Sequence, residues 1–342
     1  MITIDGSFGE GGGQIVRSSL ALAMVTGKPF RVAKMRAGRQ KPGLMRQHLT
    51  AVRAAASICG ATMRGDEIGS MELTFEPRSV KAGEYTFAVG TAGSATLVLQ
   101  TVLPALLLAD GPSVLTLEGG THNPFAPPFD FLIKAFLPLV NRMGPRVEAT
   151  LERPGFYPAG GGRFVVRIEP VKSLTGIEVM ERGELRGHRA TAVVANLRRH
   201  IAERELTVIK RKLNWGDDRL SVVEVSDTPG PGNIVMIEME SEHVTEVFTG
   251  FGEVGRSAEA VADQVLNHYL SYQRSDAPIG EYLTDQFMLP LAIAGAGAFH
   301  STGLSRHATT HIELIRKFLD VDVSIAERKT GGGCEVRIGG GS

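Results

Sequence analysis

The stretch Gly11–Pro29, GGGQIVRSSLALAMVTGKP, contains a complete helix signal with both of its boundaries. Three glycines lead into the apolar segment Ile15–Val25, which stops at Gly27-Lys28-Pro29. Glycine is enriched at helix ends, and proline cannot continue a helix. We therefore predict a buried helix of about three turns between two glycine-rich turns.

The same layout occurs twice more along the chain. Its second copy is Ala95–Ala109, between Gly93-Ser94 and Asp110-Gly111-Pro112, and its third is Tyr282–Ala294, between Ile279-Gly280-Glu281 and Gly295-Ala296-Gly297. A layout that recurs at wide spacing indicates that one supersecondary unit is used several times. The chain is therefore modular.

Each copy continues with an amphipathic segment and with short β-rich runs. Apolar residues at spacings of three and four predict second helices over Gly43–Cys59, Pro128–Met143 and Ser305–Leu319. Alternating residues predict strands at Met71–Phe75, Tyr85–Val89, Val147–Leu151, Phe164–Ile168, Val321–Ile325 and Cys334–Ile338. We expect an α/β (α+β) fold of three repeats, each with two helices on a four-stranded sheet.

The spacing of the copies predicts an insertion. The first two copies start about 80 residues apart and the last two about 190 apart, which indicates that about 90 residues have been inserted. This segment has its own pattern: strands at Ala190–Ala195, Leu220–Val225 and Ile234–Met239, and helices at His200–Leu213 and Ala258–Tyr272. We predict a catalytic domain, residues 1–180 and 274–342, interrupted by a small α/β domain, residues 181–273.

Composition excludes several classes of protein. The chain has 342 residues, 43% of them hydrophobic and 22% charged, which is typical of a globular protein. Its 37 basic and 37 acidic residues argue against binding long nucleic acids through bulk charge, so any such contact must be local. The two cysteines form no motif, and the apolar run Leu97–Ala109 is too short to span a bilayer. We expect a cytoplasmic protein without a membrane segment.

The first candidate site is the glycine-rich run Asp5–Arg17. Glycines let the backbone approach a ligand, and the amides at a helix N-terminus favour an anion. Arg17 shares a helix face with Gln14 and suits a phosphate, while Glu10 suits a divalent metal. The alternative is a tight strand-to-helix turn with a surface arginine. No GxxxxGK[ST] motif occurs, which excludes a Walker-type site.

The second candidate site is the basic run Arg36–His48. It gathers four Arg or Lys side chains, Arg36, Arg39, Lys41 and Arg46, with Gln47 and His48 expected on the first turns of the next helix. Such a density of cations in a neutral protein indicates a phosphate site, although a solvated charged loop would look the same.

The third candidate site is Ser305–His311. His307 and His311 are four residues apart and would share a helix face, which suits a metal or leaves one histidine as a nucleophile. A structural histidine pair is the alternative. Asp285, one turn after Glu281 on the third apolar helix, could contact a base, orient an imidazole or pair locally.

Together these runs resemble the RNA 3′-terminal phosphate cyclase family. The matching segments are Asp5-Gly6, Gly9–Arg17, Arg36–Arg39, Lys41–Leu44, Arg46–Leu49, Gly93-Ser94, Asn123-Pro124, Ala126–Pro128, Gly155–Gly162 and Gly280–Leu283. They cover nearly the whole chain, and the family's architecture of three repeats plus an inserted α/β domain is similar to the one predicted above.

The resemblance implies an ATP-dependent enzyme of the ligase class that converts an RNA 3′-terminal phosphate to a 2′,3′-cyclic phosphodiester. It implies a covalent histidine–AMP intermediate at His307, an RNA-adenylate, and release of AMP and pyrophosphate. It also implies RNA with a 3′-terminal phosphate and ATP as partners, Mg²⁺ or Mn²⁺ as the metal, and no obligate protein partner.

The resemblance also implies roles for individual residues. His307, Arg17 and Arg39 are implied as catalytic and Glu10 as the metal ligand. The implied nucleotide-binding residues are Gln14, Gln100, Pro127, Tyr282 and Asp285, and the implied phosphate-binding residues are Arg36, Arg39, Gln47 and His48.

Three other functions remain as alternatives. The first is a binding protein, because the family has catalytically inactive relatives that act in ribosome assembly. Those relatives lack the nucleophilic histidine, whereas this chain has His307. An enolpyruvyl transferase has a similar repeat architecture and needs no such histidine. A metal hydrolase built on His307 and His311 would need a third ligand.

Overall fold

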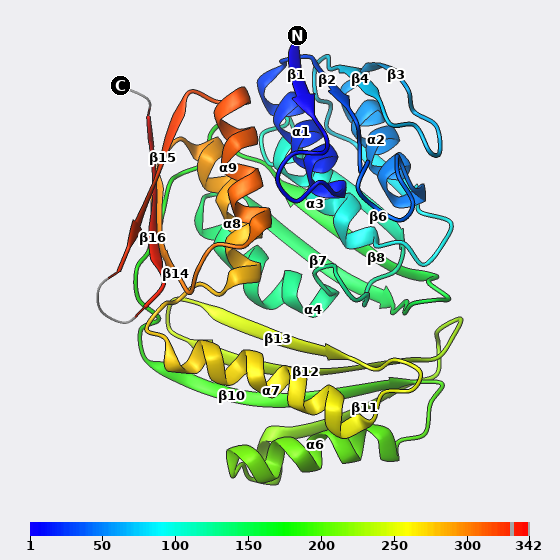
Figure 1. Ribbon diagram of the computed structural model, residues 1–342, viewed down its shortest axis with the longest axis vertical. Helices are drawn as coiled ribbons and strands as arrows, with labels where there is room; N and C mark the ends of the chain where they lie inside the picture. The colour runs from blue at the N-terminus through cyan, green and yellow to red at the C-terminus, as the bar shows by residue number, and fades with distance from the viewer. Residues whose placement is uncertain (329–331, 341–342) are drawn as a thin grey trace.

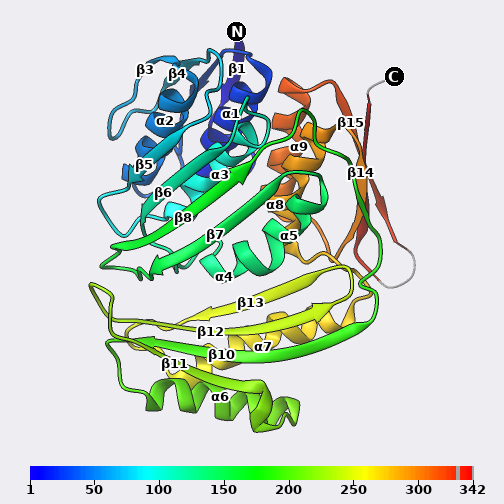
Figure 2. The ribbon, with the colours of Figure 1, turned by 180° about the vertical axis from the view of Figure 1, so that it is seen from behind.

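A computed structural model describes residues 1–328 and 332–340 of the chain; residues 329–331 and 341–342 are outside the description. Within that part, the chain forms four separate four-stranded sheets, three of them around a central group of helices (Figures 1 and 2). The predicted fold class, three repeats plus an inserted α/β unit, is confirmed.

The first repeat shows the unit on which the others are built. Its elements are β1 (Ile2–Asp5), α1 (Gly13–Thr26), β2 (Phe30–Ala33), α2 (Arg46–Cys59), β3 (Thr62–Arg64) and β4 (Leu73–Glu76). The sheet has the order β1-β2-β4-β3, with β1 and β2 parallel and the other pairs antiparallel. Helix α1 thus makes the crossover between two parallel strands.

The second and third repeats have the same strand order. The second comprises β5 (Glu84–Ala88), α3 (Ala95–Leu106), β6 (Ser113–Gly119), α4 (Phe129–Phe131), η1 (Leu132–Phe136), α5 (Leu137–Arg142), β7 (Arg146–Arg153) and β8 (Gly162–Glu169). The third comprises β9 (Glu178–Val179), α8 (Glu281–Ala294), β14 (Gly297–Ser301), α9 (Arg306–Phe318), β15 (Val321–Glu327) and β16 (Cys334–Gly340). Their sheets are β5-β6-β8-β7 and β9-β14-β16-β15.

The insertion separates the first strand of the third repeat from the rest of it. This inserted unit, Leu185–Arg274, contains β10 (Leu185–Ala195), α6 (His200–Leu213), η2 (Asp217–Arg219), β11 (Leu220–Val225), β12 (Gly232–Ser241), β13 (Thr245–Phe251) and α7 (Ala258–Arg274). Its strand order, β11-β10-β12-β13, differs from that of the repeats. It also has an apolar cluster of its own, centred on the fully buried Tyr269.

The repeats share one apolar core because their helices face inwards. Helix α1 packs against α2, α3 and α9, and α8 packs against α9 and α3, while the sheets lie outside (Figure 1). The first helix of each repeat is buried nearly all round, which explains why the predicted signal was a continuous apolar run. Among the described residues, no helix is long and apolar enough to cross a membrane.

Several predicted boundaries were wrong. Helix α2 begins at Arg46 rather than Gly43, because Gly43 has φ +73° and a Cβ there would lie 2.2 Å from the carbonyl oxygen of Gly69. The predicted helix Pro128–Met143 contains the π-helical turn η1, because Pro138 has no amide hydrogen to bond the carbonyl of Lys134. Helix α3 ends at Leu106 instead of Ala109.

Candidate functional site

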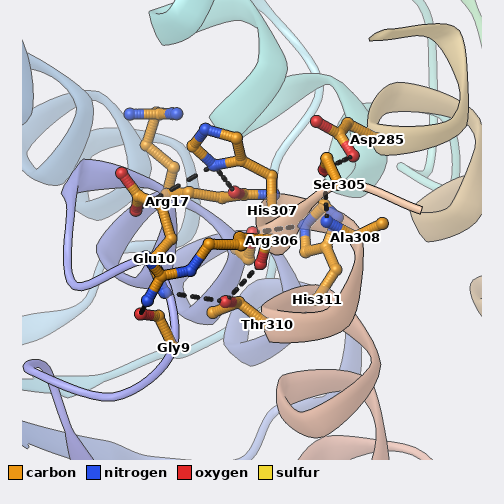
Figure 3. A network of polar contacts seen from close by, with 12 residues as sticks. Gly9, Glu10, Arg17, Asp285, Ser305, Arg306, His307, Ala308, Thr310 and His311 are labelled. Atoms are coloured by element: carbon orange, nitrogen blue, oxygen red, sulfur yellow. Dashed lines mark hydrogen bonds and ion pairs between the residues drawn. The ribbon is translucent and has the colours of Figure 1, made fainter. Parts of the chain in front are cut away.

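The glycine-rich loop between β1 and α1 lies against the start of α9. Gly9 has φ +57°, and a Cβ there would lie 2.3 Å from Thr310 Oγ1. The Glu10 amide donates to that oxygen over 3.0 Å, and the Arg306 guanidinium donates to the Gly9 carbonyl over 2.9 Å (Figure 3). Helix α9 therefore clamps the loop that carries Glu10, a role for Thr310 that the sequence did not indicate.

His307 lies at the first turn of α9. Ser305 caps this helix by accepting from the Ala308 amide over 2.9 Å, and its hydroxyl donates to Asp285 Oδ1 over 2.6 Å (Figure 3). Burial raises the pKa of Asp285 to about 7. Helix α8 thereby fixes the N-terminus of α9, and with it the position of His307.

The imidazole of His307 has a defined tautomer. Its Nδ1 lies 2.5 Å from Gln14 Oε1, and because a carbonyl oxygen can only accept, Nδ1 is the donor. In the neutral ring the lone pair is then on Nε2, and the side chain is half-exposed. Burial, opposed by Glu10 and reinforced by Arg17 and Arg39, lowers the pKa of His307, so the ring is neutral at pH 7. Neutral imidazole is the nucleophilic form.

Arg17 brings a partly buried cation to the same place. Its Nε donates to Gln100 Oε1 over 3.1 Å, and Gln100 donates to Gln286 Oε1 over 2.8 Å. Burial lowers the pKa of Arg17 to about 10, so the guanidinium keeps its charge at neutral pH. A desolvated cation is a strong partner for phosphate because water does not screen it.

His48 adds a neutral donor beside Arg17. Its Nδ1 accepts from the Met45 amide over 3.1 Å, so Nε2 carries the hydrogen. Burial and then the charges of Arg17 and Arg36 lower the pKa of His48 to about 3. A Cβ on Gly13 would lie 2.2 Å from His48 Nε2 and 2.9 Å from Arg17 Nη1, so both groups meet at the glycine that begins α1.

The residues of the basic run Arg36–His48 have different roles, since some stabilise their own loop and others contact the site. Arg36 donates to the carbonyls of Lys41 and Gly43 over 2.8 and 2.9 Å, which shapes its own loop. Arg39 instead pairs with the carboxylate of Glu10. Gln47 accepts from the Ser94 amide over 3.1 Å, at the glycine-rich turn of the second repeat.

The two carboxylate oxygens of Glu10 differ in their partners. Oε1 pairs with Arg39, while Oε2 is buried, has no hydrogen-bond partner among the described residues, and lies 4.0 Å from His307 Nδ1. A buried carboxylate oxygen without a donor is a suitable ligand for a hard cation. The residues present therefore fit a divalent metal. The described residues contain no cluster of three His, Cys, Asp or Glu side chains, so the alternative hydrolase site at His307 and His311 lacks its third ligand.

A cavity of about 310 Å³ opens beside His307. Seven residues of the implied site line it: Gln14, Arg17, Gln100, Pro127, Tyr282, Asp285 and His307. Gln286 and Phe125 line it as well, although no motif singled them out. Phe125 is exposed at φ +63°, a conformation that bulky residues rarely adopt. Arg36, Arg39, Gln47, His48 and Glu10 are not among the residues that line this cavity.

His311 points away from His307 into the core. Its Nε2 lies 2.5 Å from the hydroxyl of Ser18 on α1, and the ring is almost completely buried. Burial, reinforced by the charges of Arg17 and His307, lowers the pKa of His311 to about 4. The side chain therefore joins two helices in its neutral form.

We expect His311 to make the protein sensitive to acid. Below its ordinary pKa near 6.5, the unfolded chain binds a proton at His311 that the folded protein does not bind until about pH 4. The free energy of unfolding therefore falls as the pH drops through this range, by about 3 kcal/mol for a group of this shift. Urea unfolding at pH 7.5, 6 and 5 should show a shallower fall for His311→Gln than for wild type. Equal slopes would contradict this assignment.

The loop that contains His122 packs on the loop Gly155–Gly162. The His122 ring stacks on Phe156 with centroids 5.2 Å apart, and its Nε2 lies 3.1 Å from Asp130. A Cβ on Gly155 would lie 2.2 Å from the Gly162 amide nitrogen. This packing supports the segment that carries Phe125 and Pro127 to the cavity.

Known proteins match the chain over nearly its full length. The sequence profile of RNA 3′-terminal phosphate cyclase matches residues 8–325. The RNA 3′-terminal phosphate cyclase of Koribacter versatilis is 53% identical over 329 residues, which are 96% of this chain and 93% of the relative. That of Ralstonia nicotianae is 52% identical over 329 residues, covering 96% and 94%.

Proposed function

The chain belongs to the RNA 3′-terminal phosphate cyclase family and is an enzyme of the ligase type, and on this premise we propose that it cyclises RNA ends through a covalent histidine–AMP intermediate. The observation that carries the proposal is the hydrogen bond from His307 Nδ1 to Gln14 Oε1, since it leaves a lone pair on Nε2 and so supports His307 as the nucleophile.

In the first step, Nε2 of His307 attacks the α-phosphorus of ATP. A nitrogen–phosphorus bond forms, the bond to the bridging oxygen breaks, and pyrophosphate leaves. The proton on Nδ1 of His307 stays there and remains hydrogen-bonded to Gln14 Oε1, and the carboxylate of Glu10 4.0 Å away stabilises the positive charge that develops on the ring. Arg17 stabilises the negative charge that develops on the phosphoryl oxygens.

In the second step, an oxygen of the RNA 3′-phosphate attacks the same phosphorus and the nitrogen–phosphorus bond breaks. The product is an RNA-adenylate, and His307 is regenerated. In the third step, the vicinal 2′-hydroxyl loses its proton and attacks the 3′-phosphorus, and AMP leaves as the cyclic diester closes. Positioning supplies much of the rate for such a ring closure.

ATP as cosubstrate and Mg²⁺ or Mn²⁺ as metal are part of the proposal. Oε2 of Glu10 supports a metal there, and a bound divalent cation would neutralise phosphate charge. Arg39 pairs with Glu10, and its charge lowers the pKa of His307. The charge of Arg36 lowers the pKa of His48. Both guanidinium groups therefore lie near the site, which supports the proposal that Arg36 and Arg39 bind the RNA phosphate.

The proposal also includes the domain limits and the compartment. A separate apolar cluster in the insertion supports a catalytic domain, residues 1–180 and 274–342, around an inserted domain, residues 181–273. Cys59 and Cys334 are buried and unpaired, which supports a reducing cytoplasm.

Incubation with α-labelled ATP and Mg²⁺ tests the intermediate. The folded protein is expected to take up an acid-labile label, and RNA with a 3′-phosphate should discharge it while RNA with a 3′-hydroxyl should not. Conversion of the RNA end to a phosphatase-resistant form reports the cyclase reaction separately. If folded protein cyclises RNA without taking label, the histidine–AMP route is wrong.

A further inference from the structure

The cavity beside His307 has a second wall, which comes from the inserted unit. Thr249 and Phe251 of β13, Arg256 of the following turn, and Gln264 and His268 of α7 all line it. Figure 1 shows β13 passing directly below α4, and β13 packs against α4 and η1 of the second repeat. The inserted unit is therefore part of the same cavity as the implied nucleotide residues.

One side chain of this wall touches the implied adenosine site directly. The ring of His268 lies 6.2 Å from that of Tyr282, with the planes at 64° to one another. This is an edge-to-face arrangement, in which a ring edge contacts a π face. Tyr282 is 59% exposed despite this contact, so much of its ring remains open to a ligand.

Hydrogen bonds fix the position of the second wall relative to helix α8. The buried carboxyl of Glu246 on β13 accepts from the amide of Gly280, the N-cap of α8, over 2.6 Å. Arg182 lies 3.8 Å over the ring of Tyr272 and donates to the Ala277 carbonyl over 2.9 Å. Because Tyr282 is on the first turn of α8, these bonds fix its position relative to α7. A site fixed in this way loses little entropy when a ligand binds.

The second wall carries the cation Arg256, which donates to the Ala260 carbonyl over 3.3 Å, and the carboxylate Glu253, while its other polar residues suit a nucleobase. Thr249, Gln264 and His268 offer a hydroxyl, an amide and an imidazole, which can donate to and accept from a base edge. The partly buried cation Arg17 is instead on the side of His307. A nucleotide whose α-phosphorus is at His307 would thus extend its base between Pro127 and Tyr282 towards α7.

We propose that the inserted unit completes the adenine site, with His268 as a specificity-determining residue. The inference rests on the proposed function and deepens it: His268 supports the Tyr282 ring and, with Gln264 and Thr249, reads the edge of the base. The inserted unit then selects adenine over other bases, while the repeats hold the phosphates.

Binding of α,β-methylene-ATP to the full-length protein tests this inference, because this analogue resists attack at the α-phosphorus. His268→Ala is expected to weaken its binding about tenfold, as loss of an aromatic contact and a hydrogen bond does. Binding of inorganic triphosphate, which has no base, should change less than about twofold on the same scale. Asn267→Ala is the matched control, because Asn267 is exposed on α7 and does not line the cavity.

His268→Phe separates the two contributions and guards against a merely structural effect. It keeps a ring beside Tyr282, so most of the affinity should return, but it removes the polar edge, so the preference for the adenine analogue over the guanine analogue should fall. Equal affinity and preference in wild type and His268→Ala would overturn the inference and leave the proposed function intact. Weaker binding of RNA alone would also overturn it. Failure of wild type to bind the analogue would overturn both.

Discussion

His307→Ala should reduce protein–AMP formation by roughly 10³-fold or more, as expected when a nucleophile is removed. Two other histidines near the site are unsuited to replace it: His311 points into the core and bonds Ser18, and Nδ1 of His48 accepts from the Met45 amide, so its Nε2 carries a hydrogen instead of a lone pair. The measurement is uptake of label from α-labelled ATP, followed by cyclisation of RNA with a 3′-phosphate.

Thr309→Ala is the matched control for this variant. Thr309 is an exposed residue on the same helix, two positions further on, so its loss should leave labelling unchanged. A synthetic RNA-adenylate adds a second readout: His307→Ala should still close its ring, since the histidine has left the reaction by then. Label on His307→Ala equal to that on wild type would show that another group is the nucleophile.

Arg17→Met should lower the rate of labelling by about 10²–10³-fold, the usual effect of removing one group that stabilises developing charge. The same variant should be at least as stable as wild type. Arg17 is partly buried and has no ion pair within the described residues, so the desolvation of its charge is not offset by a carboxylate in contact. Thermal unfolding and single-turnover labelling of one preparation measure the two effects together.

Arg17→Lys is the companion variant. It keeps the charge but loses the Nε donor to Gln100, so its rate should fall between those of wild type and Arg17→Met. An activity loss in Arg17→Met that scales with a loss of thermal stability would mean that Arg17 acts through the fold and not on phosphate.

The repeats could be predicted from the sequence because their signals are local. A glycine turn, an apolar run and a glycine stop lie within about 20 residues of one another, and each helix is set by those neighbours. The strand Thr245–Phe251 was missed because Gly250 weakens its pattern, although pairing with β12 stabilises it.

The sequence names the candidate residues, but most of their contacts could not be predicted from it. His307 and Gln14 are 293 positions apart, and Glu10 and Thr310 are 300 apart, so only the packing of the first repeat against the third joins them. The role of Thr310 and the second wall of the cavity depend on such packing alone. No spacing in the sequence marks α7 as a neighbour of Tyr282.

The interruption of the third repeat also bears on protein synthesis. On the ribosome, β9 emerges long before its neighbour β14, with the inserted unit between them, whereas the inserted unit is continuous and can fold as soon as α7 has emerged. The nascent chain can therefore carry a folded inserted unit while the third repeat is still incomplete. Helix α9 follows later still, so an incomplete polypeptide lacks His307, the residue proposed here as the nucleophile.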